Sequence, residues 1–305
     1  MRRISAALLA TVALGAAAVA PAKALMIAMK PPAQRALSAD VVVVGKVTSV
    51  ERDTVEIAPF PGSPQKISHK VAVVKVETAL AGAANVTHLK VAFIPRPPAV
   101  EPAPAPPNGA PQLIRRPIRP GMMAPELKVG DEFLLFLNKP AAGGVYLIPN
   151  MSPPIDAKTD EGKKEVETVK KVLAVVADPA TALKADTADA RYHAAATLVT
   201  KYRAYPETGG EVDQVPVAAD ESRLILAALA GGDWTKFDRD APNGLQAFYS
   251  LGLTDKDGWT PPKPAPAKPG QPPVNFNQVT HDAFAAWVAG PGKDYQIKRI
   301  VPKAK

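Results

Sequence analysis

In the first half of the chain, the apolar positions follow the short, β-branched pattern of strands. Four consecutive valines open the stretch 40–51, and alternation of apolar and polar residues follows them. The links between such stretches contain no helical crossover, so the strands should pair as an antiparallel barrel or sandwich. The expected strands cover residues 40–51, 67–76, 89–94, 132–137 and 145–148.

Beyond residue 156 the apolar spacing changes to that of amphipathic helices. Asp178 and Thr187 are typical residues of helix starts, and Gly231 and Gly290 of helix ends. The expected helices cover residues 163–176, 187–202, 219–230, 245–251 and 280–289. We therefore predict an α+β protein, with an antiparallel β-barrel domain over residues 25–155 and a separate α-helical domain over residues 156–305.

Two segments are too rich in proline to belong to a core. Residues 95–125 contain eleven of the 34 prolines, and residues 261–273 contain seven. Proline has no backbone N–H and cannot continue a helix or a strand ladder, so both segments should be extended polyproline-type loops. A solvated inserted loop is the preferred interpretation, and a docking motif for aromatic grooves is the alternative.

The first 24 residues have the pattern of a secretory signal peptide. Arg2 and Arg3 precede an apolar run, and Ala22 and Ala24 form a small-residue cleavage motif. We expect cleavage after Ala24 and a secreted or periplasmic protein. A retained membrane anchor is the alternative, but the run is rich in alanine and close to the lower limit of about 17 residues for a span. No later stretch of the sequence could cross a membrane.

Cysteine content and charge exclude several function classes. The chain has no cysteine, which removes thiol nucleophiles, cysteine zinc sites, iron–sulfur clusters and disulfides. Its formal charge of +8 falls to +5 when the three basic residues of segment 1–24, which has no acids, are removed. Basic pairs are dispersed along the rest of the sequence, whereas nucleic-acid proteins gather positive charge on one face. No nucleic-acid partner is therefore expected.

Three segments of the first half resemble the netrin-like domain, the OB-fold barrel of tissue inhibitors of metalloproteinases. They are residues 38–47 (SADVVVVGKV), residues 71–82 (VAVVKVETALAG), and residues 127–137 (LKVGDEFLLFL) followed by 144–147 (GVYL). The resemblance covers residues 25–150 and implies an OB-type barrel there. Family inhibitors hold the zinc of their target enzyme through an N-terminal cysteine. Leu25 stands at that position here, so metalloproteinase inhibition is disfavoured.

No catalytic, cofactor-binding or metal-ligating residue can be assigned from sequence motifs. Nucleophile-elbow, Walker and dinucleotide-binding motifs are absent. The Asp-rich segments 238–244 and 255–258 lack the twelfth-position glutamate of a calcium loop, so ordinary turns are expected. Structural or surface roles, and no cofactor, are expected for four histidines without ligand spacing: His69, His88, His193 and His281.

The last quarter of the chain is rich in large aromatic residues. Exposed, they would form a sugar platform or a partner interface; buried, they would form the core of a small helical domain. The core interpretation is preferred. The set comprises Trp234, Phe237, Phe248, Tyr249, Trp259, Phe276, Phe284, Trp287 and Tyr295.

The resulting hypothesis is an exported, non-enzymatic protein that acts through protein–protein or cell-envelope interactions. Its basis is the signal peptide, the absence of catalytic motifs and the presence of two domain types. The alternative is an exported hydrolase with a site of carboxylates and a histidine between the two domains. Metalloproteinase inhibition is the third, disfavoured possibility. The partner is not identified by the sequence.

Overall fold

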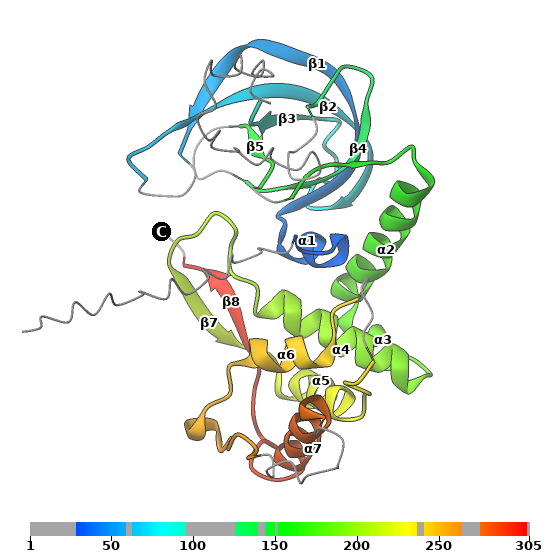
Figure 1. Cartoon of the computed structure of the whole chain (residues 1–305), viewed down its shortest axis with the longest axis vertical. Helices are drawn as coiled ribbons and strands as arrows, with labels where there is room; N and C mark the ends of the chain where they lie inside the picture. Colours follow the sequence, from blue (N-terminus) through cyan, green and yellow to red (C-terminus); the bar gives the residue numbers. More distant parts are fainter. Residues whose placement is uncertain are drawn as a thin grey trace, which may run out of the picture.

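The protein is a mixed α+β structure (Figure 1). The computed structural model describes residues 29–58, 63–95, 126–139, 144–149, 152–236, 241–263 and 275–303. The signal peptide predicted over residues 1–24 lies outside these ranges, as do most of the two proline-rich segments. No helix within the described ranges is both long and apolar enough to cross a membrane.

Six strands of the first half form one sheet in the order β5-β3-β2-β1-β4-β6. The strands predicted from the apolar pattern are confirmed. Their bounds are β1 (Val41–Ile57), β2 (Ile67–Ala81), β3 (His88–Phe93), β4 (Glu132–Leu137) and β5 (Tyr146–Leu147). The sixth strand, β6 (Ile155–Asp156), was not predicted.

The expectation of a purely antiparallel sheet is wrong at one pair, because β3 and β5 are parallel. An isolated antiparallel bridge joins Asn138, at the end of β4, to Leu147 in β5. Strand direction alternates from β3 through β2 and β1 to β4, and the bridge reverses it once more. β5 therefore runs in the same direction as β3, and the two can pair only in parallel.

Strands β1 and β4 are buried on both faces, which explains their uninterrupted apolar sequence. One face contributes Val43 and Leu135 to a cluster inside the curved sheet. The other face contributes Val42 and Phe136 to a second cluster, which is covered by two helices. These helices are α1 (Pro32–Ser38) and α2 (Asp160–Ala177).

Helix α1 was not predicted, since seven residues are too few to show a helical period. Its start is marked only by Pro32 in the first turn. Leu37 is buried against α2, and its carbonyl oxygen accepts a hydrogen bond of 2.8 Å from Lys201 Nζ of α4. The short helix thus contacts the sheet, α2 and α4 together.

Arg35 of α1 is a buried cation at this junction. Its guanidinium lies 4.6 Å from the centroid of the Phe136 ring, and Nη1 donates to the Pro153 carbonyl at 2.7 Å. Burial lowers the pKa of Arg35 to about 10, and the charge of Glu165 opposes this shift. The side chain therefore stays charged at neutral pH and ties α1 to the sheet.

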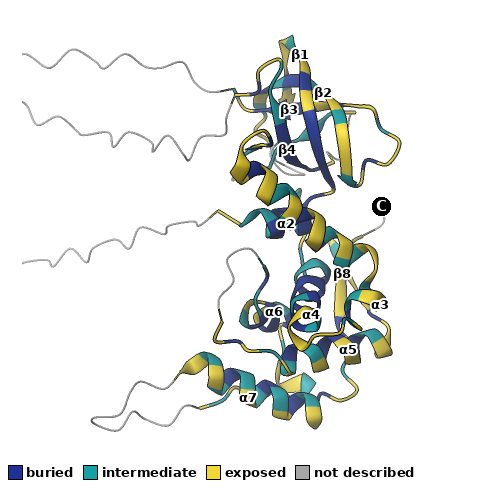
Figure 2. Cartoon of the chain, turned by 90° about the vertical axis from the view of Figure 1, so that its right-hand side faces the viewer, coloured by how far each residue is buried: buried dark blue, intermediate teal, exposed yellow. Residues whose placement is uncertain are grey.

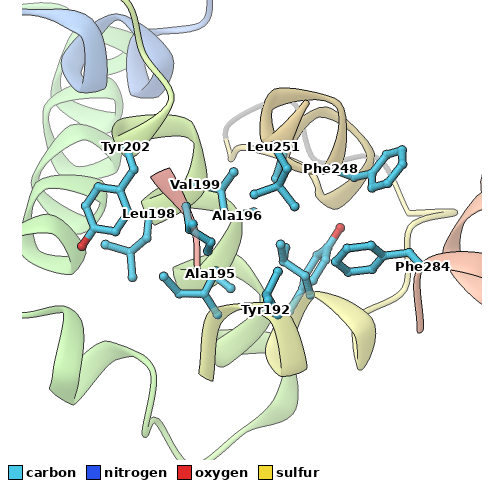
Figure 3. Close-up of a cluster of buried hydrophobic side chains, with 14 of the residues drawn as sticks. Tyr192, Ala195, Ala196, Leu198, Val199, Tyr202, Phe248, Leu251 and Phe284 are labelled. Carbon is cyan, nitrogen blue, oxygen red and sulfur yellow. The ribbon is translucent and has the colours of Figure 1, made fainter. Parts of the chain in front are cut away.

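The second half contains the predicted helices around a buried central helix, α4. Thr187 caps α4 by accepting from Ala190 N, and alanines along α4 let its neighbours pack closely (Figure 3). Figure 2 shows α4 buried along much of its length. The helices are α3 (Pro179–Ala182), α4 (Ala188–Tyr202), α5 (Ala219–Ala230), α6 (Gly244–Leu251), the 3₁₀ turn η2 (Asp255–Asp257) and α7 (Phe276–Ala289).

Two strands in the second half were not predicted, so this half is not purely helical. β7 (Val212–Pro216) pairs antiparallel with β8 (Lys298–Pro302). Most of their side chains are at least partly exposed, and only Ile300 is buried. Because so few positions are buried, the two strands show little alternation of apolar and polar residues. Their sequence therefore does not predict them.

The contact of Leu37 should matter for stability. We predict that Leu37→Ala lowers the free energy of unfolding by about 2–5 kcal/mol, because it opens a cavity between α1 and α2. The measurement is urea unfolding followed by circular dichroism. The matched control is Leu224→Ala on α5, where leucine is 39% exposed rather than 1%. Equal losses in the two variants would contradict the role given to α1.

Candidate functional site

The structure gives the four histidines separate environments. His69 is buried in β2 with Nδ1 2.7 Å from the Ile67 carbonyl oxygen, and His88 is exposed in β3. His193 lies 3.5 Å from Asp189 on α4, and His281 contacts the Ala230 carbonyl at 3.0 Å. Within the described ranges, no group of three or more His, Asp or Glu side chains could hold a metal ion.

The acidic turn at residues 255–258 is held by internal hydrogen bonds, as expected of an ordinary turn. Asp257 Oδ2 accepts from Thr254 N at 3.0 Å and from Thr254 Oγ1 at 2.8 Å, forming a capping box. Asn243 caps α6 by accepting from Gln246 N at 2.8 Å. The residues Phe237, Asp238 and Asp240 lie outside the described ranges.

The tryptophans are core residues, as predicted. Trp234, Trp259 and Trp287 are all buried, and each packs against another aromatic ring. Two members of the aromatic set differ: Tyr249 is 59% exposed and Phe276 is 47% exposed. The aromatic cluster therefore has a buried base and two rings that reach the surface.

These two exposed rings border a groove of about 240 Å³, which we call the aromatic groove. Its described lining contains no Asp, Glu, Lys, Arg or His. The lining residues come from α6, the first turns of α7 and the segment between them: Phe248, Tyr249, Gly252, Leu253, Trp259, Pro261, Pro262, Phe276 and Thr280.

A close backbone approach positions α6 at the groove. Gly244 N donates to Tyr192 Oη of α4 at 2.7 Å, and burial raises the pKa of that phenol. A Cβ on Gly244 would lie 2.6 Å from Trp234 Nε1, so only glycine fits there. With α6 fixed in this way, Phe248 faces the interior and Tyr249 faces outward.

Helix α7 and the segment that follows η2 supply further lining residues of the groove. Asn275 caps α7 by accepting from Asn277 N at 3.1 Å and Gln278 N at 3.4 Å, which places Phe276 at the helix start. The ring of Trp259 packs edge-on against Phe248, with centroids 5.0 Å apart. Two lining residues of the groove, Phe248 and Trp259, thus pack against each other.

The indole nitrogen of Trp259 differs from those of the other two tryptophans. Trp234 Nε1 donates to the Leu229 carbonyl at 3.0 Å, and Trp287 Nε1 donates to the Asp257 carbonyl at 2.9 Å. No described residue accepts a hydrogen bond from Trp259 Nε1, although this ring lines the groove. An indole N–H usually finds a hydrogen-bond acceptor, which for Trp259 would have to come from outside the described residues.

The chain matches no protein-family model and no curated protein sequence. The functional argument therefore depends on the geometry of the aromatic groove.

The buried ring of Phe248 and the exposed rim rings of Tyr249 and Phe276 should contribute differently to the stability of the fold. We predict that Phe248→Ala lowers the free energy of unfolding by about 3–5 kcal/mol. The double variant Tyr249→Ala/Phe276→Ala should lose far less, because both rings are largely in solvent. Thermal unfolding of the two variants compares them directly. A rim variant as unstable as Phe248→Ala would show that the rim rings are structural.

Proposed function

We propose that this chain is an exported, non-enzymatic interaction protein whose aromatic groove binds an extended, proline-rich segment of a partner protein. The observation that carries the proposal is a groove in which Tyr249 and Phe276 are exposed and no described residue accepts a hydrogen bond from Nε1 of the lining residue Trp259. Grooves lined by aromatic residues are a recurring way of binding polyproline segments.

The chemistry of a polyproline segment suits this groove. Its flat, apolar pyrrolidine rings can pack on Tyr249 and Phe276. Its backbone has no internal hydrogen bonds, so a free carbonyl can accept from Trp259 Nε1. Because the segment is extended before it binds, little conformational entropy is lost on binding. The uncharged lining offers no salt bridge to an ionic ligand.

The export part of the proposal comes from residues 1–24. Their charge, apolar length and A-x-A motif support cleavage after Ala24 and a secreted or periplasmic location. A protein without cysteine depends on burial rather than on disulfides for its stability in such a compartment.

We also propose that the first half is an OB-type barrel of the netrin-like kind, followed by a helical domain. The bridge between Asn138 and Leu147 supports closure, with two backbone hydrogen bonds of 2.9 and 3.0 Å that link β4 to β5. In the proposed barrel, this bridge would complete a ring of five strands in the order β1, β2, β3, β5 and β4. An odd ring of strands must contain one parallel pair, as β3 and β5 do.

The hydrolase alternative has less support. One cavity of the described structure combines a histidine with a carboxylate, His69 with Glu207, between the sheet and the α4–β7 loop. His69 Nδ1 is 2.7 Å from the Ile67 carbonyl, and Glu207 forms an ion pair with Lys30. In a Ser-His-Asp site a carboxylate accepts from Nδ1–H of the histidine, and His69 has a backbone carbonyl at that position instead.

A labelled decaproline peptide should bind the exported chain, followed by fluorescence anisotropy. We predict that Tyr249→Ala/Phe276→Ala weakens this binding at least about tenfold, since each buried aromatic contact contributes about 1 kcal/mol or more. Tyr205→Ala is the matched control, because Tyr205 is also exposed but does not line the groove. Absence of binding, or equal weakening by Tyr205→Ala, would refute the proposal.

The export proposal has a separate test. When the chain is produced in a bacterium with a general secretion pathway, the exported form should begin at Leu25, as shown by N-terminal sequencing. Ala24→Asp should block processing, because the cleavage site requires a small residue. Recovery of exported protein that still carries residues 1–24 would show that the segment is an anchor instead.

A further inference from the structure

We infer that Asp257 is a positioning residue of the aromatic groove, because its hydrogen bonds hold the turn that leads into Trp259. This inference rests on the proposed function and adds a residue that supports the same site. Asp257 is not among the described lining residues of the groove. It belongs to the acidic turn at residues 255–258, and its carboxylate accepts hydrogen bonds from Thr254.

The turn connects two lining residues of the groove, Leu253 and Trp259. Between them, Thr254, Asp255 and Gly258 are exposed. The burial of apolar surface therefore contributes little to holding this part of the chain. Its conformation, and with it the position of Trp259 relative to Leu253, depends on the hydrogen bonds of the turn.

The carboxylate of Asp257 closes the turn. Its Oδ2 accepts from Thr254 N at 3.0 Å and from Thr254 Oγ1 at 2.8 Å. The carbonyl oxygen of Thr254 accepts in turn from Trp259 N at 3.1 Å. Asp257 thus holds Thr254, and Thr254 holds the backbone of Trp259.

The backbone of Asp257 ties the same turn to α7. Its carbonyl oxygen accepts from Nε1 of the buried Trp287 of α7 at 2.9 Å. The next residue, Gly258, has a φ of +72°, and a Cβ there would lie 2.9 Å from Pro291 Cβ. Because Phe276 at the start of α7 also lines the groove, Asp257 links two parts of the lining.

The experiment compares decaproline binding by wild-type chain and three variants, followed by fluorescence anisotropy. Asp257→Ala should weaken binding at least about threefold, because a turn that is open part of the time leaves the groove complete in only a fraction of the molecules. Asp257→Asn should bind as tightly as wild type, since its amide oxygen can accept the same two hydrogen bonds.

Asp255→Ala is the matched control and should also bind as wild type does. It removes the same charge from the same turn, but the described hydrogen bond of the Asp255 carboxylate is to its neighbour, Lys256 N. Far-UV circular dichroism verifies that each variant is folded. If Asp257→Ala does not fold, Thr254→Val, which removes one of the two donors to Asp257, takes its place in both measurements.

Amide hydrogen exchange gives a second readout, which does not depend on the peptide. The amides of Gly258 and Trp259 donate to carbonyl oxygens of the turn, so they exchange when the turn opens. Both should exchange at least about threefold faster in Asp257→Ala than in Asp255→Ala. Equal exchange rates in these two variants would overturn the inference.

The binding data separate this inference from the proposed function. If wild type binds decaproline and Asp257→Ala binds it equally well, only the inference falls. If wild type does not bind, the proposed function falls and the inference falls with it. Asp257→Asn as weak as Asp257→Ala would assign the effect to the charge rather than to the hydrogen bonds, and would overturn the inference as well.

Discussion

The structure depends on the covering of strands β1 and β4 on both of their faces. Their inner face fills the curved sheet, and their outer face would expose Val42, Val44, Leu134 and Phe136 if nothing packed on it. Each such side chain contributes about 1.5–3 kcal/mol when it is buried. Helices α1 and α2 supply the cover, and both also contact α4. The same two helices therefore determine where the second half lies against the sheet.

The groove follows from this arrangement through α4. Tyr192 on α4 accepts from Gly244 N and so determines the start of α6. Phe248 packs into the aromatic core, whereas the next residue on the helix, Tyr249, is exposed. Trp259 then packs edge-on against Phe248 and leaves its N–H without an acceptor among the described residues. The groove thus arises where the aromatic core reaches the surface.

The sequence predicts most of the elements that are long enough to show a regular spacing of apolar residues. Strands β1 to β5 and helices α2 to α7 fall close to their predicted ranges. The elements that were not predicted are α1 and β6, which are too short to show a period, and β7 and β8, which bury little. The parallel β3–β5 pair joins segments more than 50 residues apart, and no local pattern in the sequence records such a pairing. The groove was missed because Phe248 and Tyr249 are adjacent aromatics, and only tertiary packing decides which one is exposed.

The central claim is that Trp259 donates to a proline-rich ligand. The most direct test follows the three indole N–H signals of the ¹⁵N-labelled exported chain by NMR as decaproline is added. The account predicts that the Trp259 signal moves downfield as its N–H gains an acceptor, while Trp234 and Trp287 keep their carbonyl partners and shift little. A Trp259 signal that does not move, or three signals that move equally, would contradict it.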